Sequence, residues 1–201
     1  MKARSLRLGL LSILPFLAGG PVFGDLNPDS YSVGGGARQV KGSNLGFGDE
    51  KLVPFYRMQA NWEVDDKLEI FLRGDFANGE LDLSPSHLDD GRVDGNFQSV
   101  GAGVNYYPFD HHFSLNLGVE FFHANFDLEG ELWGFNHTTE DSVIGWGASI
   151  GVTYELGITP NFTAGFFVQY NLTDNESRRG SYDFDGFGAG VQFKFVIPKP
   201  R

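Results

Sequence analysis

The feature that most constrains the fold is an alternation of apolar residues with small or polar residues in two neighbouring runs, 144–154 and 162–170. One face of 144–154 is apolar and the other is rich in glycine, and the same alternation resumes after a short connection at 155–161. Successive side chains of a β-strand point to opposite sides, so this period predicts a hairpin of two strands. A strand of about eleven residues tilted by about 40° spans about 28 Å along the normal, close to the ~25 Å apolar band of an outer-membrane barrel.

The same alternation recurs elsewhere, so the chain is predicted to contain eight strands. These strands are expected at 31–40, 52–62, 68–76, 100–107, 113–122, 144–154, 162–171 and 186–195. The connections alternate between long segments and tight turns; the long ones are 41–51, 78–96, 127–141 and 173–183, and the short ones are 63–67, 108–111 and 155–161. This pattern predicts an all-β fold, an eight-stranded antiparallel up-and-down transmembrane β-barrel. In that topology both termini and the tight turns are periplasmic, and the four long loops are extracellular.

Alternation alone also fits a secreted β-sandwich or a lipocalin-like barrel, in which the apolar faces would point inward. Three features favour lipid on the outside instead. Aromatic residues gather at the strand ends, glycine suits the narrow interior of an eight-stranded barrel, and the loops alternate strictly in length.

The first residues predict export. Residues 1–24 begin with three basic side chains, continue with an apolar run at 8–18 that is too short to span a bilayer, and end with small residues at 22 and 24, which is typical of a secretory signal peptide. The predicted division is a signal peptide at 1–24, a periplasmic lead at 25–30, the outer-membrane barrel at 31–197 and a periplasmic tail at 198–201.

Charge and cysteine content exclude several functions. Cleavage after position 24 removes three basic residues from a chain of net charge −11, leaving 177 residues with a net charge of −14. Such a chain is not expected to bind nucleic acid by neutralising phosphates. Because cysteine is absent, no disulfide, thiolate nucleophile or thiolate metal site is expected. No cofactor is indicated.

Three segments resemble the OmpA-like and OmpX-like small outer-membrane barrels. They are Gly101-x-Gly103-x-x-Tyr106-Tyr107-Pro108-Phe109, the turn Tyr154-Glu-Leu-Gly157, and Gly188-x-Gly190-x-x-Phe193-x-Phe195. The resemblance covers nearly the whole cleaved chain but departs from the family in two ways: no peptidoglycan-binding domain follows, and the chain continues past Phe195 to Arg201. It implies a monomer in a Gram-negative outer membrane that contacts lipid, lipopolysaccharide and the barrel-assembly machinery. The long loops would meet any extracellular ligand, whose identity the sequence does not indicate.

Aromatic side chains at the ends of the apolar columns predict two girdles at the membrane interfaces. The periplasmic girdle is expected to comprise Trp62, Tyr106, Tyr154 and Phe162, and the outer girdle Phe76, Phe121, Trp146 and Tyr170.

Charged residues on the opposite columns predict an ionic network that plugs the lumen in two layers. The middle and outer layer is expected to comprise Arg38, Arg57, Arg73, Asp75 and Glu120, and the periplasmic layer Lys194, Glu155, Glu63 and Glu69. These charges must be paired, because an unpaired charge in so narrow a space would cost several kcal/mol. Five aromatic residues should share the interior, which is only just wide enough for side chains: Phe55, Phe71, Tyr107, Phe122 and Phe167.

The function favoured by this plugged lumen is a non-enzymatic structural or surface-interaction barrel. One alternative is a narrow pore or small-solute carrier. A second is a lipid A-modifying enzyme, because His112-Phe113-Ser114 resembles the His-x-Ser spacing of lipid A deacylases. The predicted topology argues against this enzyme, since it places both residues at a periplasmic turn, with Ser114 inward, whereas the acyl chains of lipid A lie in the outer leaflet.

Acidic segments at 89–94 and 183–186 lack the spaced oxygen ligands and closing glutamate of a calcium loop. Solvated loop charge is therefore the favoured interpretation, with weak divalent-ion bridging to lipopolysaccharide as the alternative. No catalytic residue, cofactor site or metal site is predicted.

Overall fold

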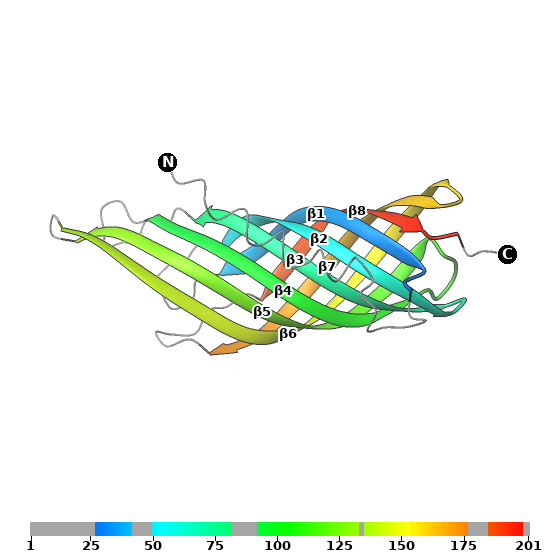
Figure 1. The fold of residues 1–201 in the computed structure, drawn as a ribbon, viewed down its shortest axis with the longest axis horizontal. Helices are drawn as coiled ribbons and strands as arrows, with labels where there is room; N and C mark the ends of the chain where they lie inside the picture. Colours follow the sequence, from blue (N-terminus) through cyan, green and yellow to red (C-terminus); the bar gives the residue numbers. More distant parts are fainter. Residues whose placement is uncertain (1–26, 42–49, 82–91, 133–134, 177–184, 199–201) are drawn as a thin grey trace.

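The computed structural model describes residues 27–41, 50–81, 92–132, 135–176 and 185–198. Within these ranges the chain forms a single closed barrel in which each strand pairs antiparallel with the next and the last closes on the first (Figure 1). The strands are β1 Ser30–Lys41, β2 Glu50–Asp65, β3 Leu68–Leu81, β4 Arg92–Tyr106, β5 Phe113–Leu132, β6 Phe135–Thr159, β7 Phe162–Glu176 and β8 Gly186–Val196. The predicted fold class is confirmed. The predicted signal peptide lies outside the described residues.

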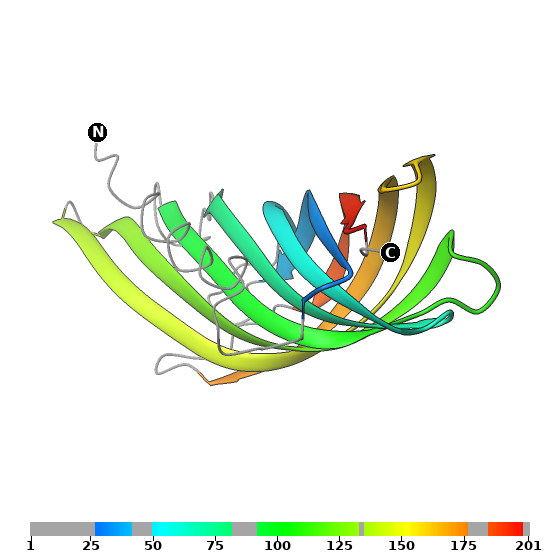
Figure 2. The same cartoon turned by 45° about the vertical axis from the view of Figure 1, so that its right-hand side comes forward.

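Several strands are longer than the alternation predicted. The expected loop at 127–141 is mostly strand, because β5 and β6 stay paired up to Leu132 and Phe135. The loops expected at 41–51, 78–96 and 173–183 are likewise shortened by strand extensions, and the turn at 155–161 reduces to Pro160 and Asn161. Backbone pairing continues beyond the apolar band whether or not the side chains alternate, so the pattern marks only the membrane-facing part of each strand. The hairpin of β5 and β6 consequently projects well past β1 and β8 (Figures 1 and 2).

The pairing register fixes the width of the barrel. A path that starts at Ser30 and moves from each residue to its registered partner on the next strand returns to β1 after one circuit of the barrel. It arrives at position 40, which is ten residues further along β1. The partners on the way are Asn61, Phe71, Gly103, Gly118, Ser149, Asn171 and Gly186. A stagger of ten residues over eight strands corresponds to a strand tilt of about 40° and a backbone radius of about 8 Å.

The described residues have the polarity of a soluble protein turned inside out. Lumen-facing charges such as Arg57 and Asp75 are 4% and 3% exposed, whereas Val119, Trp146 and Phe166 on the outer face are each about 60% exposed. A protein surrounded by water would bury the second group and solvate the first. The alternative of a soluble sandwich or lipocalin-like barrel is therefore wrong, and the apolar outer face is a lipid-facing surface. No helix among the described residues is long and apolar enough to cross a membrane.

Glycine is required where an aromatic ring crosses the narrow lumen. The Phe71 ring, which is 2% exposed, lies over the paired residues Gly103 and Gly118 of β4 and β5. A Cβ atom on Gly103 would approach the tip of the Phe71 ring to 2.5 Å, and one on Gly118 to 3.2 Å. These two glycines form the slot that lets a large side chain fit inside eight strands.

A substitution at Ala148 tests which side of the barrel faces lipid. Ala148 lies on the outer face of β6 between Val119 and Leu172. Changing Ala148 to arginine should lower the free energy of unfolding by about 2 to 4 kcal/mol, because a charge near the bilayer middle is costly. Urea titration in lipid vesicles measures this loss.

The matched control is Ala148→Leu, which lipid accepts. A barrel surrounded by water would instead tolerate the arginine at least as well as the leucine. Gly147 is unsuitable as the opposite-face control, since a Cβ there would lie 2.8 Å from the Leu172 carbonyl oxygen and strain the wall whichever side faces lipid.

Candidate functional site: the filled lumen

The outer part of the ionic network is anchored by a bidentate pair between adjacent strands. Arg57 on β2 and Asp75 on β3 are registered partners. The Nε and Nη2 atoms of Arg57 donate to the two carboxylate oxygens of Asp75 at 2.8 and 2.7 Å. Because both side chains are buried, this fork-to-fork geometry satisfies charges that neither residue could carry alone in the lumen.

Glu120 on β5 joins this pair to the far wall. Its carboxylate lies 3.6 Å from Nη2 of Arg38 and 3.3 Å from Nη2 of Arg73, and it accepts a hydrogen bond from the Ser99 hydroxyl. Arg73 in turn lies 3.6 Å from Asp75 and donates to Ser149. The structure therefore brings together all five residues predicted for the middle and outer layer.

Aromatic rings cover the guanidinium groups of this layer. Arg38 lies over Phe97 with its Cζ atom 4.7 Å from the ring centre, Arg57 lies 4.5 Å from Phe167, and Arg73 lies 5.5 Å from the ring of Phe71 on its own strand. Such cation–π contacts stabilise cations that have lost their water.

The layer near the tight turns has a different composition. Lys194 forms an ion pair with Glu69 and lies 3.9 Å from Glu155. The Tyr107 hydroxyl donates to Glu69 at 2.9 Å, and Asn105 donates to the same carboxylate at 3.1 Å. Glu69 therefore receives three donors, from Lys194, Tyr107 and Asn105.

Glu63 is the predicted member of this layer that is not in the interior. It is the registered partner of Glu69, and the alternation of side chains along β2 would point it inward. Its side chain is nevertheless exposed at the barrel rim. The inward column of β2 ends there, at the β-bulge between Glu63 and Asp65.

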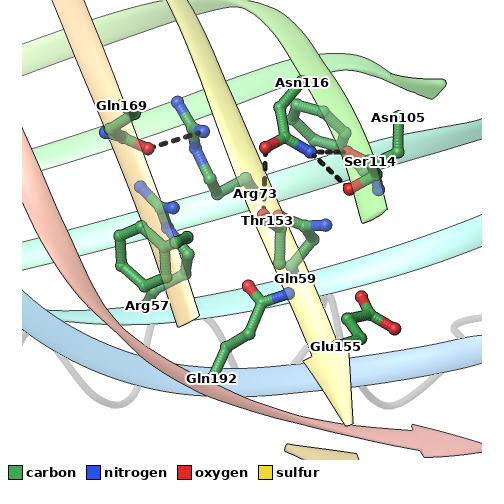
Figure 3. A pocket seen from close by; sticks show the side chains of 12 residues that line it. Arg57, Gln59, Arg73, Asn105, Ser114, Asn116, Thr153, Glu155, Gln169 and Gln192 are labelled. Atoms are coloured by element: carbon green, nitrogen blue, oxygen red, sulfur yellow. Dashed lines mark hydrogen bonds between the residues drawn. The ribbon is translucent and has the colours of Figure 1, made fainter. Parts of the chain in front are cut away.

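The two layers carry opposite surplus charges. Three arginines face two carboxylates in the middle and outer layer, and one lysine faces two carboxylates in the layer below. The surplus base and the surplus acid meet a common cavity of about 20 Å³, whose lining includes Arg73 and Glu155 (Figure 3). The cavity has room for about one water molecule.

Neutral amide and hydroxyl groups fill the space around this cavity, and sequence reasoning missed them. Asn116 donates to Asn105 and Ser114 and accepts from the Thr153 hydroxyl (Figure 3). Gln169 accepts from Arg73 at 3.5 Å. Alternation along each strand predicts that these residues point inward, but it does not indicate which of them form hydrogen bonds across the lumen.

Apolar side chains close the lumen on the long-loop side. Val53, Phe55, Ala77 and Phe167 form a buried cluster, with Phe97 packed against it. The predicted inward aromatic residues Phe55, Phe71, Tyr107, Phe122 and Phe167 are all buried. Along β2 the inward residues change from apolar Val53 and Phe55, through Arg57, to the amides Gln59 and Asn61, so the lumen is stratified.

His112 and Ser114 do not form a catalytic pair. The His112 ring donates from Nδ1 to the Glu155 carbonyl oxygen at 2.9 Å and lies near the Tyr154 ring. The Ser114 hydroxyl is 1% exposed inside the lumen and accepts from Asn116. The acidic segments at 89–94 and 183–186 lie largely outside the described residues, and no cluster of metal-ligating side chains occurs in the ranges that the structure covers.

The predicted girdle residues all lie on the outer face. Trp62, Tyr106, Tyr154 and Phe162 are close to the tight turns, as the topology required. Phe121 and Trp146 are registered partners, and Phe76 and Tyr170 are partly buried. Their depths in a bilayer stay a prediction.

Glu120 is the residue whose loss tests the network most directly. Changing it to glutamine removes a buried charge without changing shape, and leaves three arginines with one carboxylate. The barrel should lose about 3 to 5 kcal/mol of unfolding free energy in a urea titration.

Two variants serve as controls. Glu63→Gln alters an exposed carboxylate and should leave stability close to that of the unmutated chain. Arg38→Gln leaves two bases with two acids, so it should cost less than Glu120→Gln. Equal losses for the two buried variants would contradict the surplus of positive charge in this layer.

Comparison with known proteins gives no match in sequence and a clear match in fold. No protein-family model matches the chain, and no curated protein does either. Among solved structures, the chain is similar to Ail, the attachment invasion locus protein of Yersinia pestis, at 15% identity and a TM-score of 0.53, over 85% of this chain and 99% of that one.

Two further structures give the same result. Neisserial surface protein A matches at 16% identity with a TM-score of 0.54, over 84% of this chain and 96% of that one. OprG from Pseudomonas aeruginosa matches at 13% identity with a TM-score of 0.54, over 85% and 98%. All three are small outer-membrane barrels, and the chain therefore has the fold of the small eight-stranded outer-membrane β-barrels.

Proposed function

We propose that this chain is a non-enzymatic outer-membrane barrel that acts as a structural or surface-interaction protein and does not conduct solutes. The observation that carries the proposal is the filled lumen. Apolar side chains, paired charges and hydrogen-bonded amides occupy successive levels, and the cavity found between them has room for about one water molecule.

The proposed orientation places the tight turns and both ends of the barrel chain in the periplasm. The start of β1 and the end of β8 lie at the same end of the barrel as the three tight turns (Figure 1). Backbone hydrogen bonds tie these ends together, since Ile197 donates to Asp29 and Asp29 donates to Asn61. Short periplasmic turns are the rule in outer-membrane barrels, which supports this orientation.

A surface-interaction role is supported by the unequal heights of the walls. The sheet of β4, β5 and β6 continues in register up to Leu132 and Phe135, whereas β1 ends at Lys41 and β8 begins at Gly186. One wall therefore stands above the opposite rim (Figure 2). Ail, the attachment invasion locus protein of Yersinia pestis, has a similar fold.

Two other functions have weaker support. The polar cavity between the ionic layers favours a narrow pore over an entirely dry barrel, so conduction is the second candidate. A lipid A-modifying activity has no geometric support, because His112 and Ser114 point to different partners. The three similar structures are small outer-membrane barrels, which agrees with a structural or surface-interaction role but excludes no activity in this chain.

Single-channel conductance tests whether the lumen is closed to ions and solutes. The purified, folded protein in planar lipid bilayers should give no stable single-channel currents, because the described side chains fill the lumen apart from a cavity with room for about one water molecule. An open porin in the same bilayers is the positive control. Large, stable currents from the unmutated chain would make the pore the correct function.

Fractionation tests the location. In a Gram-negative host the protein should be recovered in the outer membrane and should migrate on gels at different positions before and after boiling, because a closed hydrogen-bonded barrel resists detergent. Recovery as a soluble periplasmic protein would contradict the proposal.

A further inference from the structure

Four exposed apolar side chains lie at the tight-turn end of the barrel. Val64 lies near the end of β2, Phe109 in the β4–β5 turn and Ile158 near the end of β6, and Ile197 follows β8. Their exposed fractions are 54%, 85%, 58% and 40%. We call these four residues the rim ring; the connections that carry them lie at one end of the barrel (Figures 1 and 2).

The rim ring continues the lipid-facing columns. Val64 lies two residues after the outward-facing Trp62, at the β-bulge that ends the pairing of β2, and Ile197 lies two residues after Phe195, just beyond β8. Ile158 lies at the corresponding bulge of β6, two residues after Leu156. Phe109 folds back against Phe113 at the foot of β5, with the ring centres 6.5 Å apart. All four residues therefore lie at or next to the ends of strands whose outer face is apolar.

Exposed polar residues lie next to two of these apolar side chains. Asp65, Asp66 and Lys67 are exposed beside Val64, and Asp110, His111 and His112 are exposed beside Phe109. Single exposed apolar residues are common on soluble surfaces and need no explanation. Here four such residues lie together at one end of the barrel, at or next to the ends of strands whose outer face is apolar.

We propose that the rim ring is buried in the interfacial region of the bilayer. The tight-turn end of the barrel would then lie within this region instead of projecting into water. The inference rests on the proposed membrane location. Its partner is a phospholipid surface, because the ring is continuous with the lipid face and because apolar side chains gain free energy by entering the boundary between headgroups and acyl chains.

The proposal moves the lower membrane boundary past the predicted girdle. Val64 lies two residues beyond Trp62, which at a tilt of about 40° is about 5 Å nearer the barrel end. Trp62, Tyr106, Tyr154 and Phe162 would then lie within the lipid near this boundary, and the rim ring would mark the interface.

Spin labelling tests this placement without background, because the chain contains no cysteine. Single cysteines at Val64, Phe109, Asp66 and Ala148 are labelled with a nitroxide in barrels folded into vesicles of phosphatidylethanolamine and phosphatidylglycerol. Collision with oxygen reports lipid, and collision with a water-soluble nickel complex reports water. The gel shift on boiling confirms that each variant is folded.

The expected result is oxygen-dominated relaxation at Val64 and Phe109, weaker than at Ala148, together with nickel-dominated relaxation at Asp66 on the same turn. Nickel-dominated relaxation at Val64 and Phe109, with Ala148 still in lipid, would overturn the rim ring and leave the membrane barrel intact. Protection of Val64 and Phe109 from both reagents would show a protein contact instead of lipid and would also overturn it. Nickel-dominated relaxation at Ala148 would defeat the proposed function itself.

Discussion

Closure of the backbone hydrogen-bond ladder is the constraint on which the rest of this structure depends. Lipid offers no partners for peptide groups, so the sheet must join its first strand to its last. Eight strands with a stagger of ten residues then leave a backbone radius of about 8 Å. That width decides which side chains the interior can hold, and it explains why Gly103 and Gly118 stand opposite the ring of Phe71.

Because the lumen is narrow, each inward side chain must both fit among its neighbours and have its polar or charged groups satisfied by them. Arg73 alone contacts residues from β3, β5, β6 and β7. In a wider barrel such a side chain would meet water first. Here its charge is satisfied by carboxylates, a hydroxyl, an amide and an aromatic face, and the surplus of bases in its layer is matched by the surplus acid Glu155 across the cavity.

The sequence predicted the fold and most of the ionic network because a strand has a period of two. Parity assigned Arg57, Asp75 and Glu120 to one side and Trp146 and Val119 to the other, and the structure has them there. Alternation carries no information on where pairing stops, so it predicts neither the extension of β5 and β6 nor the exposure of Glu63, whose inward column ends at the rim. The cluster around Asn116 could not be predicted as a network, because hydrogen-bond partners across the lumen depend on the stagger, which no local pattern reveals.

The distribution of the charged residues over the strands sets an order of assembly. Arg57 and Asp75 belong to neighbouring strands and can meet as soon as one hairpin forms. Glu120 of β5 meets Arg38 of β1, and Lys194 of β8 meets Glu69 of β3, only when distant parts of the chain face each other across the finished cylinder. Until that moment these side chains can remain hydrated. The barrel therefore gains this long-range pairing, and loses the hydration of these charges, only when β1 joins β8.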